Sequence, residues 1–275
     1  MSRPITLAHS PDSDDAFMFY ALAKGKIDSR GLAFTHVLKD IQTLNEAASQ
    51  GIYDVTAISF HAYPRVRDKY ALTRAGSSVG FGYGPMIVSK DPMLDFTKAV
   101  VAIPGKLTTA YLALQLFRPG LETRIVPFDR IPEAVAKGEA DAGLLIHEGQ
   151  LTYGDLQLHK IVDLGEWWKR ETGLPLPLGG NAVRRSLDPE TQRNVNAIIR
   201  DSVQWALGHR GETLNHALSY GRGLDRKRGD AFVGMYVNDF TLDLGPQGEE
   251  GLRRLFSMGH RKGLLPDAVE PDFVS

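Results

Sequence analysis

Short apolar runs alternate with helical patterns in two separate blocks of this chain, and this alternation is the strongest constraint on its fold. Each run is long enough for one buried strand, and each helical pattern for one crossover helix. Repetition of strand and helix predicts an α/β protein with parallel sheets and right-handed crossovers. The predicted strands are Ile5–Ala8, Phe34–Leu38 and Val55–Phe60 in the first block, and Val100–Ile103, Arg124–Phe128 and Ala142–Ile146 in the second.

Helices are predicted between these strands from capping residues, from apolar positions three and four residues apart, and from closing glycines. The first helix opens at Asp12–Asp15 and closes at Gly25. The chain from about Pro189 onward is also predicted to be mainly helical. The remaining predicted helices are Ile41–Ser49, Thr108–Phe117, Ile131–Lys137 and a short helix His61–Lys69 that Pro64 disturbs.

Two extended segments separate the blocks. Ser77–Val88 is rich in glycine and then becomes apolar, and Leu174–Asn181 alternates leucine with proline before two glycines. Two crossings of this kind are typical of a hinge between two lobes that close by rigid-body rotation. We therefore predict an α/β two-lobed fold with a hinge of two crossing segments, in which residues 1–88 and 183–275 form lobe one and residues 89–182 form lobe two.

Composition excludes several kinds of partner and site. The 275 residues carry a formal net charge of -1 without a block of lysine or arginine, so nucleic acid is not an expected partner. Apolar stretches of about 18 residues are absent, so no membrane span is expected. The lack of cysteine excludes disulfides and thiolate metal sites. The first residues lack the apolar run of a signal peptide, which predicts a cytoplasmic location. A homodimer is compatible with the sequence.

Ligands of open parallel sheets bind outside the carboxyl ends of the strands. Histidines follow three of the predicted strands, namely His9, His61 and His147. An imidazole changes charge near neutral pH, so His147 is a candidate general acid or base, or else a hydrogen-bonded structural residue. A metal site is not predicted, because the histidines fall in two lobes and lack the HxH and HExxH spacings.

The loop after the first strand is acidic. Asp12 or Ser13 can cap the following helix, and acidic residues complement its positive end. The alternative is that Asp14, Asp15 or Ser10 faces the cleft and binds substrate hydroxyls.

The turn before the Thr108–Phe117 helix is a candidate anion site. Thr108 is a good N-cap residue, and a helix N-terminus with neighbouring hydroxyls can bind a carboxylate through Thr108 and Thr109. Gly84, in the glycine-rich crossing, either permits close approach of the backbone to a ligand or belongs to a plain hinge. The expected ligand is therefore a small anionic organic molecule.

Five segments together resemble one family, and they cover nearly the whole chain. The family is the 1,4-dihydroxy-6-naphthoate synthases of the futalosine route to menaquinone. The family's first loop usually reads Ser-Pro-Cys-Pro-Asn-Asp-Thr-Phe, whereas this chain has Ser-Pro-Asp-Ser-Asp-Asp-Ala-Phe at residues 10–17. The segments are His9–Tyr20, Pro104–Tyr111, Gly143–Glu148, Val162–Trp168 and Thr172–Gly179.

The resemblance implies a periplasmic-binding-protein-like (type II) fold and a cytoplasmic lyase that needs no metal or cofactor. Its substrate would be cyclic dehypoxanthine futalosine. His147 would be the catalytic base, Thr108 and Thr109 would hold the substrate carboxylate, and Ser59 with Asp14–Asp15 would line the other lobe. Two alternatives stay open: a chorismate dehydratase of the same pathway, and a non-catalytic solute-binding protein for a small carboxylate.

Overall fold

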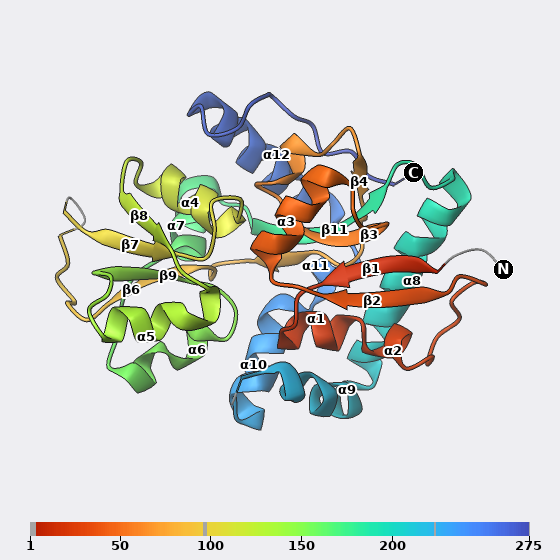
Figure 1. Cartoon of the computed structure of the whole chain (residues 1–275), viewed down its shortest axis with the longest axis horizontal. Coiled ribbons are helices and arrows are strands. Elements are labelled where there is room, and N and C mark those ends of the chain that lie inside the picture. Colours follow the sequence, from red (N-terminus) through yellow and green to blue (C-terminus); the bar gives the residue numbers. More distant parts are fainter. Residues whose placement is uncertain (1–3, 96–97, 223, 275) are drawn as a thin grey trace.

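Two β-sheets lie side by side in the computed structural model, which describes residues 4–95, 98–222 and 224–274 (Figure 1). Residues 1–3, 223 and 275 of the predicted lobe one and residues 96–97 of the predicted lobe two lie outside the described residues. In pairing order, the first sheet contains β2 (Phe34–Leu38), β1 (Ile5–His9), β3 (Val55–Ser59), β11 (Leu176–Arg184) and β4 (Tyr70–Leu72), with β5 (Ser78–Gly80) also paired to β11. The second sheet contains β10 (His159–Asp163), β6 (Met86–Ser89), β9 (Ala142–Leu145), β7 (Val100–Ile103) and β8 (Glu122–Ile125).

Both sheets are mixed, so the prediction of parallel sheets is wrong in part. β1 is parallel to β2 and β3, and β7 is parallel to β8 and β9. β11 is antiparallel to its partners, and β6 is antiparallel to β9 and β10. These antiparallel strands adjoin the two crossings, where the chain changes sheet without returning through a crossover helix.

Helices divide between the two sheets. We call each sheet with its helices a half. The first half contains α1 (Ser13–Met18), α2 (Tyr20–Ala23), α3 (Ile41–Gln50), α8 (Pro189–Gly208), α9 (Arg210–Ala217), α10 (Arg226–Tyr236) and α11 (Asp239–Leu242). The second half contains α4 (Thr109–Phe117), α5 (Ile131–Ala136), α6 (Gly149–Thr152) and α7 (Leu164–Thr172). The last helix, α12 (Gly245–Arg261), packs against both β11 and α4 (Figure 1).

Helix ends follow the capping signals of the sequence. Asp40 caps α3 by accepting a hydrogen bond from the backbone N of Thr43 at 3.0 Å. The same helix ends at Gly51, whose φ of 67° is in the left-handed region that favours glycine. These local signals explain why α3 and the neighbouring strands lie close to their predicted bounds.

The predicted helix His61–Lys69 is wrong. The structure has a short 3₁₀ turn, Tyr63–Arg65, with Pro64 near its start, and then β4 begins at Tyr70. Proline can begin a helix but is not tolerated in its interior, so a helix could not start at His61 and continue through Pro64.

The two crossings pair with each other. Gly80 of β5 is opposite Leu176 of β11, and Ser78 is opposite Gly179. All of β11 pairs within the first sheet, although the predicted lobe two runs to residue 182. The lobe boundaries themselves stay a prediction.

The C-terminal helices cover the first half. α8 buries Val195, Ile198, Ile199 and Val203, and this spacing of three and four residues places them on one face. α8 packs against α1 and α2, and burial of each such side chain stabilises the fold by about 1.5–3 kcal/mol. Of the helices in the described part of the chain, none combines the length and the apolar character that a membrane crossing requires.

Candidate active site

A cavity lies between the two halves. Its enclosed volume is about 110 Å³. Its walls are mainly apolar, and most of its polar groups come from strand ends and helix starts. The predicted site residues on its wall are Asp14, Asp15, Ser59, Thr108, Thr109 and His147.

His147 follows β9 in a strained backbone conformation. Its φ is 52°, in the left-handed region that few residues other than glycine adopt. The imidazole packs against Phe128 with the ring centroids 4.8 Å apart, and its side chain is 16% exposed. Its Nε2 is buried without a hydrogen-bond partner among the described residues. Strain of this kind is retained where the surrounding structure holds it, often at functional sites.

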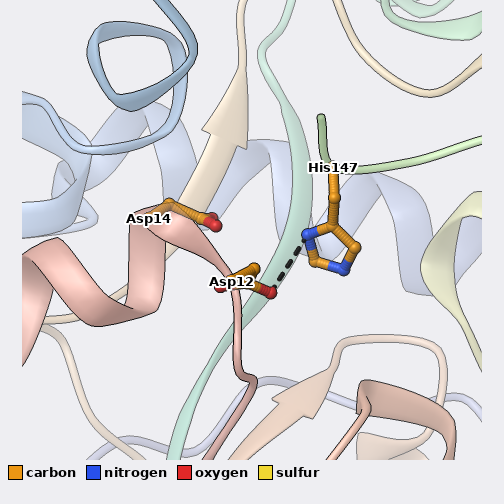
Figure 2. Close-up of side chains that lie close together, drawn as sticks. All are labelled: Asp12, Asp14 and His147. Atoms are coloured by element: carbon orange, nitrogen blue, oxygen red, sulfur yellow. Dashed lines mark ion pairs between the residues drawn. The ribbon is translucent and has the colours of Figure 1, made fainter. Parts of the chain in front are cut away.

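Asp12 contacts His147 from the other half (Figure 2). Its Oδ1 accepts a hydrogen bond from the backbone N of Asp15 at 3.2 Å and caps α1, as one alternative of the sequence analysis predicts. Its Oδ2 lies 3.2 Å from Nδ1 of His147. Sequence reasoning missed this pair, because the spacing of two residues in different halves carries no signal.

Three carboxyl groups are buried together at the start of α1, and together they cannot all carry charge. Burial raises the pKa of Asp14 well above its ordinary value, and the charges of Asp12 and Asp15 raise it further. Burial, followed by the charge of Asp12, also raises the pKa of Asp15, although Asp15 accepts a hydrogen bond from the backbone N of Ser10 at 2.6 Å.

Asp12 differs from its two neighbours. Burial acts to raise its pKa, but the charge of His147 and hydrogen bonds to its carboxylate outweigh burial, and the pKa lies below its ordinary value. Asp12 is therefore the carboxyl group of this cluster that holds a negative charge.

The start of α4 faces the cavity with two threonines. The hydroxyl of Thr108 caps the helix by accepting a hydrogen bond from the backbone N of Tyr111 at 3.2 Å, and it donates its only hydrogen to the carbonyl of Gly105 at 2.8 Å. The hydroxyl of Thr109 accepts from the backbone N of His61 at 3.1 Å and keeps its hydrogen available. Thr109, with the first amides of α4, is thus the better placed of the two to bind an anion.

Ser59 ends β3 and is held by α3. Its Oγ accepts a hydrogen bond from Nδ2 of Asn45 at 3.0 Å, and its backbone N donates to Oδ1 of the same residue at 2.9 Å. The Ser59 hydroxyl can therefore donate its hydrogen to a ligand in the cavity.

Gly84 does not lie on the cavity wall, whereas its neighbour Pro85 does. A Cβ atom at Gly84 would lie 3.0 Å from the backbone N of Gly165. The lack of a side chain lets the crossing pack closely against the start of α7, which is the hinge alternative of the sequence analysis.

His9 and His61 lie behind the cavity wall. Nε2 of His9 lies 3.1 Å from Nδ1 of His36, and Nδ1 of His61 lies 3.1 Å from the carbonyl oxygen of Thr108. Burial lowers the pKa of each to about 4, so both are neutral at neutral pH. They are hydrogen-bonded structural histidines.

Three polar residues on the cavity wall lie away from the predicted strand ends. Tyr236 of α10 donates a hydrogen bond to Oε1 of Gln150 in α6 at 2.8 Å, across the two halves. Asn181 of β11 donates through Nδ2 to the carbonyl of Gly76 at 3.0 Å, and its Oδ1 has no hydrogen-bond partner among the described residues. A lone asparagine in an otherwise apolar crossing is the signal that could have identified Asn181.

Glu148 joins the two halves beside His147. Its Oε1 accepts hydrogen bonds from the backbone N of Ser13 at 3.2 Å and from the Ser13 hydroxyl at 2.9 Å. Its Oε2 accepts one from Arg222 at 3.2 Å, and Arg222 also donates to the carbonyl of Pro11 at 3.0 Å. These contacts join the two halves beside His147.

Donor atoms of Asp12, Asp14 and His147 all lie within 4.8 Å of one another, the only such group of three in the described part of the chain (Figure 2). Divalent cations prefer ionised carboxylates, whereas the raised pKa of Asp14 favours its protonated form. We assign no metal to this group, and the absence of a metal stays a prediction.

Comparison with known proteins gives a consistent result. A family model described as menaquinone biosynthesis matches residues 5–261. A 1,4-dihydroxy-6-naphthoate synthase from Thermus thermophilus is 40% identical over 270 residues, which cover 98% of this chain and 99% of that protein. A crystal structure of a protein from Archaeoglobus fulgidus is 47% identical with a TM-score of 0.92, and the match covers 95% of this chain and 98% of that chain.

A more distant structure shows the fold alone. The alkanesulfonate-binding protein from Xanthomonas axonopodis pv. citri has a TM-score of 0.72 at 13% identity, with 98% of each chain covered. The predicted α/β, periplasmic-binding-protein-like fold is confirmed by this likeness.

Proposed function

Since the chain belongs to the menaquinone biosynthesis family, we propose that it is a 1,4-dihydroxy-6-naphthoate synthase. Its substrate is then cyclic dehypoxanthine futalosine, which it cleaves to 1,4-dihydroxy-6-naphthoate and a sugar-derived fragment. The relatives that carry this name match nearly the whole chain, and the match includes both sheets.

The observation that supports a catalytic site best is the environment of His147. Its imidazole lies on the wall of a cavity between two halves, and Nε2 has no partner among the described residues. A solute-binding protein needs no titrating group without a partner in its cleft, whereas a general base needs a free lone pair next to the substrate.

In the proposed reaction, the substrate carboxylate binds Thr109 and the first amides of α4. Nε2 of His147 accepts a proton from the substrate, and the electron pair that the proton leaves moves into the ring system. A carbon–carbon bond then breaks, the ring becomes aromatic, and the departing fragment takes up a proton. Positioned acid–base catalysis contributes about a hundred- to ten-thousand-fold, and orientation in the closed cavity adds to this.

The test is turnover by the purified protein. We expect mass spectrometry to show conversion of cyclic dehypoxanthine futalosine and none of chorismate. His147→Asn should abolish turnover and leave folding intact, because asparagine tolerates the left-handed backbone of this position. His159→Asn is the matched control, since His159 is an exposed residue of β10.

Other outcomes would contradict the proposal in distinct ways. Conversion of chorismate would favour the dehydratase, and tight retention of an unchanged carboxylate would favour a binding protein. Full turnover by His147→Asn would remove the base assignment while leaving the substrate in place.

A further inference from the structure

The Asp12–His147 pair joins two residues that each half holds in place separately. Asp12 is 1% exposed, and its Oδ1 is fixed by the backbone N of Asp15 at the start of α1. His147 is fixed by the turn after β9 and by contact with Phe128. The 3.2 Å contact between Oδ2 and Nδ1 therefore exists when the two halves are together.

The two ring nitrogens of His147 have different surroundings. Nδ1 is the nitrogen nearer to Asp12, 3.2 Å from Oδ2, in an ion pair that lacks the alignment of a hydrogen bond, while Nε2 lies on the far side of the ring (Figure 2). Neither Nε2 nor Oδ2 of Asp12 has a hydrogen-bond partner among the described residues. A neutral imidazole carries one hydrogen, and a neighbouring carboxylate favours that hydrogen on the nitrogen facing it. Nε2 is then left with a lone pair.

We propose that Asp12 is a positioning residue that keeps the hydrogen of His147 on Nδ1, so that Nε2 is the base when the two halves close. This inference rests on the proposed function of His147 as the base. When Nε2 accepts the substrate proton, the hydrogen on Nδ1 stays in place, and the carboxylate of Asp12 stabilises the positive charge of the imidazolium. No co-reactant is required.

Asp12 is also a departure from the family that the chain resembles, whose first loop usually has cysteine at this position. A cysteine side chain is shorter and is not a permanent anion at neutral pH.

The first measurement needs neither substrate nor variant activity. In protein labelled with ¹⁵N-histidine, the signals of His147, assigned by their loss in His147→Asn, should show a protonated Nδ1 and an unprotonated Nε2. The opposite tautomer would overturn the proposal. Because this measurement uses no substrate, it tests the effect of Asp12 on the tautomer of His147 even if the protein does not convert the proposed substrate.

The second measurement uses Asp12→Asn and Asp12→Ser, both of which keep a good N-cap residue for α1. Each should lower kcat by about a hundredfold with KM within about twofold, and each should remove the tautomer preference of His147. Asp188→Asn is the matched control, since Asp188 caps α8 by accepting a hydrogen bond from the backbone N of Thr191 at 2.9 Å.

Two results of this series would overturn the proposal. One is an unchanged kcat in both Asp12 variants. The other is loss of wild-type activity on chelation and its return with Mn²⁺, which would make the group around His147 a cation site.

Discussion

Replacement of Asp14 by asparagine should make the folded protein more stable at neutral pH. Asp14 is 6% exposed, and its Oδ1 has no hydrogen-bond partner among the described residues. Burial and the neighbouring carboxylates raise its pKa well above the ordinary value of 3.8. The unfolded chain ionises Asp14 freely, so folding at neutral pH either keeps a proton on Asp14 or buries a further negative charge.

Both states of Asp14 cost free energy of similar size. Keeping the proton costs about 1.4 kcal/mol for each pH unit above the ordinary pKa, or about 4 kcal/mol at pH 7. Donor atoms of Asp14 and Asp12 lie within 4.8 Å of each other. Two unit charges no farther apart than this repel by at least about 3.5 kcal/mol at an effective dielectric constant of about 20. The amide of asparagine avoids both costs. Burial of this amide without a full set of hydrogen bonds destabilises the fold by about 1 kcal/mol.

We therefore expect Asp14→Asn to raise the free energy of unfolding by about 3 kcal/mol at pH 7, which corresponds to about 6–12 °C in Tm. Folded Asp14 binds more protons than unfolded Asp14, so the advantage of the variant should grow as pH rises and disappear near pH 4. Thermal unfolding of both proteins between about pH 4 and about pH 8 checks this, because the histidines contribute equally to both. Asp188→Asn should not stabilise at any pH. A variant that is less stable at neutral pH, or an offset that does not change with pH, would refute the reasoning.

Two further predictions concern His61 and Glu148. The folded pKa of His61, about 4, lies below the ordinary 6.5, so the unfolded chain binds more protons between these values and stability falls as pH falls through them. His61→Gln should remove about 2 kcal/mol of this loss at pH 5, measured as a smaller drop in Tm between pH 7 and pH 5. An equal drop would contradict it. Glu148→Gln should weaken the contacts to Ser13 and Arg222 by about 1.5–3 kcal/mol and favour an open form, seen as a larger radius of gyration in small-angle X-ray scattering. Arg222→Ala should do the same, and an unchanged radius in both variants would show that these contacts do not hold the halves together.

Local signals in the sequence account for much of the fold. β2 and β7 have their predicted bounds, and α4 begins directly after Thr108, the predicted cap. These elements depend on residues within a few positions of one another, namely a cap, an apolar period or a closing glycine. The sequence predicts a crossing over Leu174–Asn181, and it does not predict a strand there, since Pro177 and Gly179 are poor strand residues. The pairing of β11 with β3 and β5 depends on segments far away in the chain.

The candidate site likewise contains residues that local signals identify and residues that depend on contacts between distant segments. The rule that ligands bind at carboxyl ends of strands identified His147 and Ser59, since both lie directly beyond or at such an end. It could not identify the partner of His147, because Asp12 already has a sufficient role as a helix cap. Gln150 and Tyr236 meet only when the halves come together, and a pattern within one segment carries no information on that contact.

The position of α12 limits how molecules can enter and leave. α12, at the top of Figure 1, packs against β11 and α4, and Lys262 just beyond it donates a hydrogen bond to the carbonyl of Leu116 at 3.1 Å. We expect the halves to turn about an axis near α12 and to part on the opposite side, near α10. Substrate and product would then use the same entrance to the cavity, so each product must be released before the next substrate binds. A molecule bound at this entrance would block both substrate binding and product release.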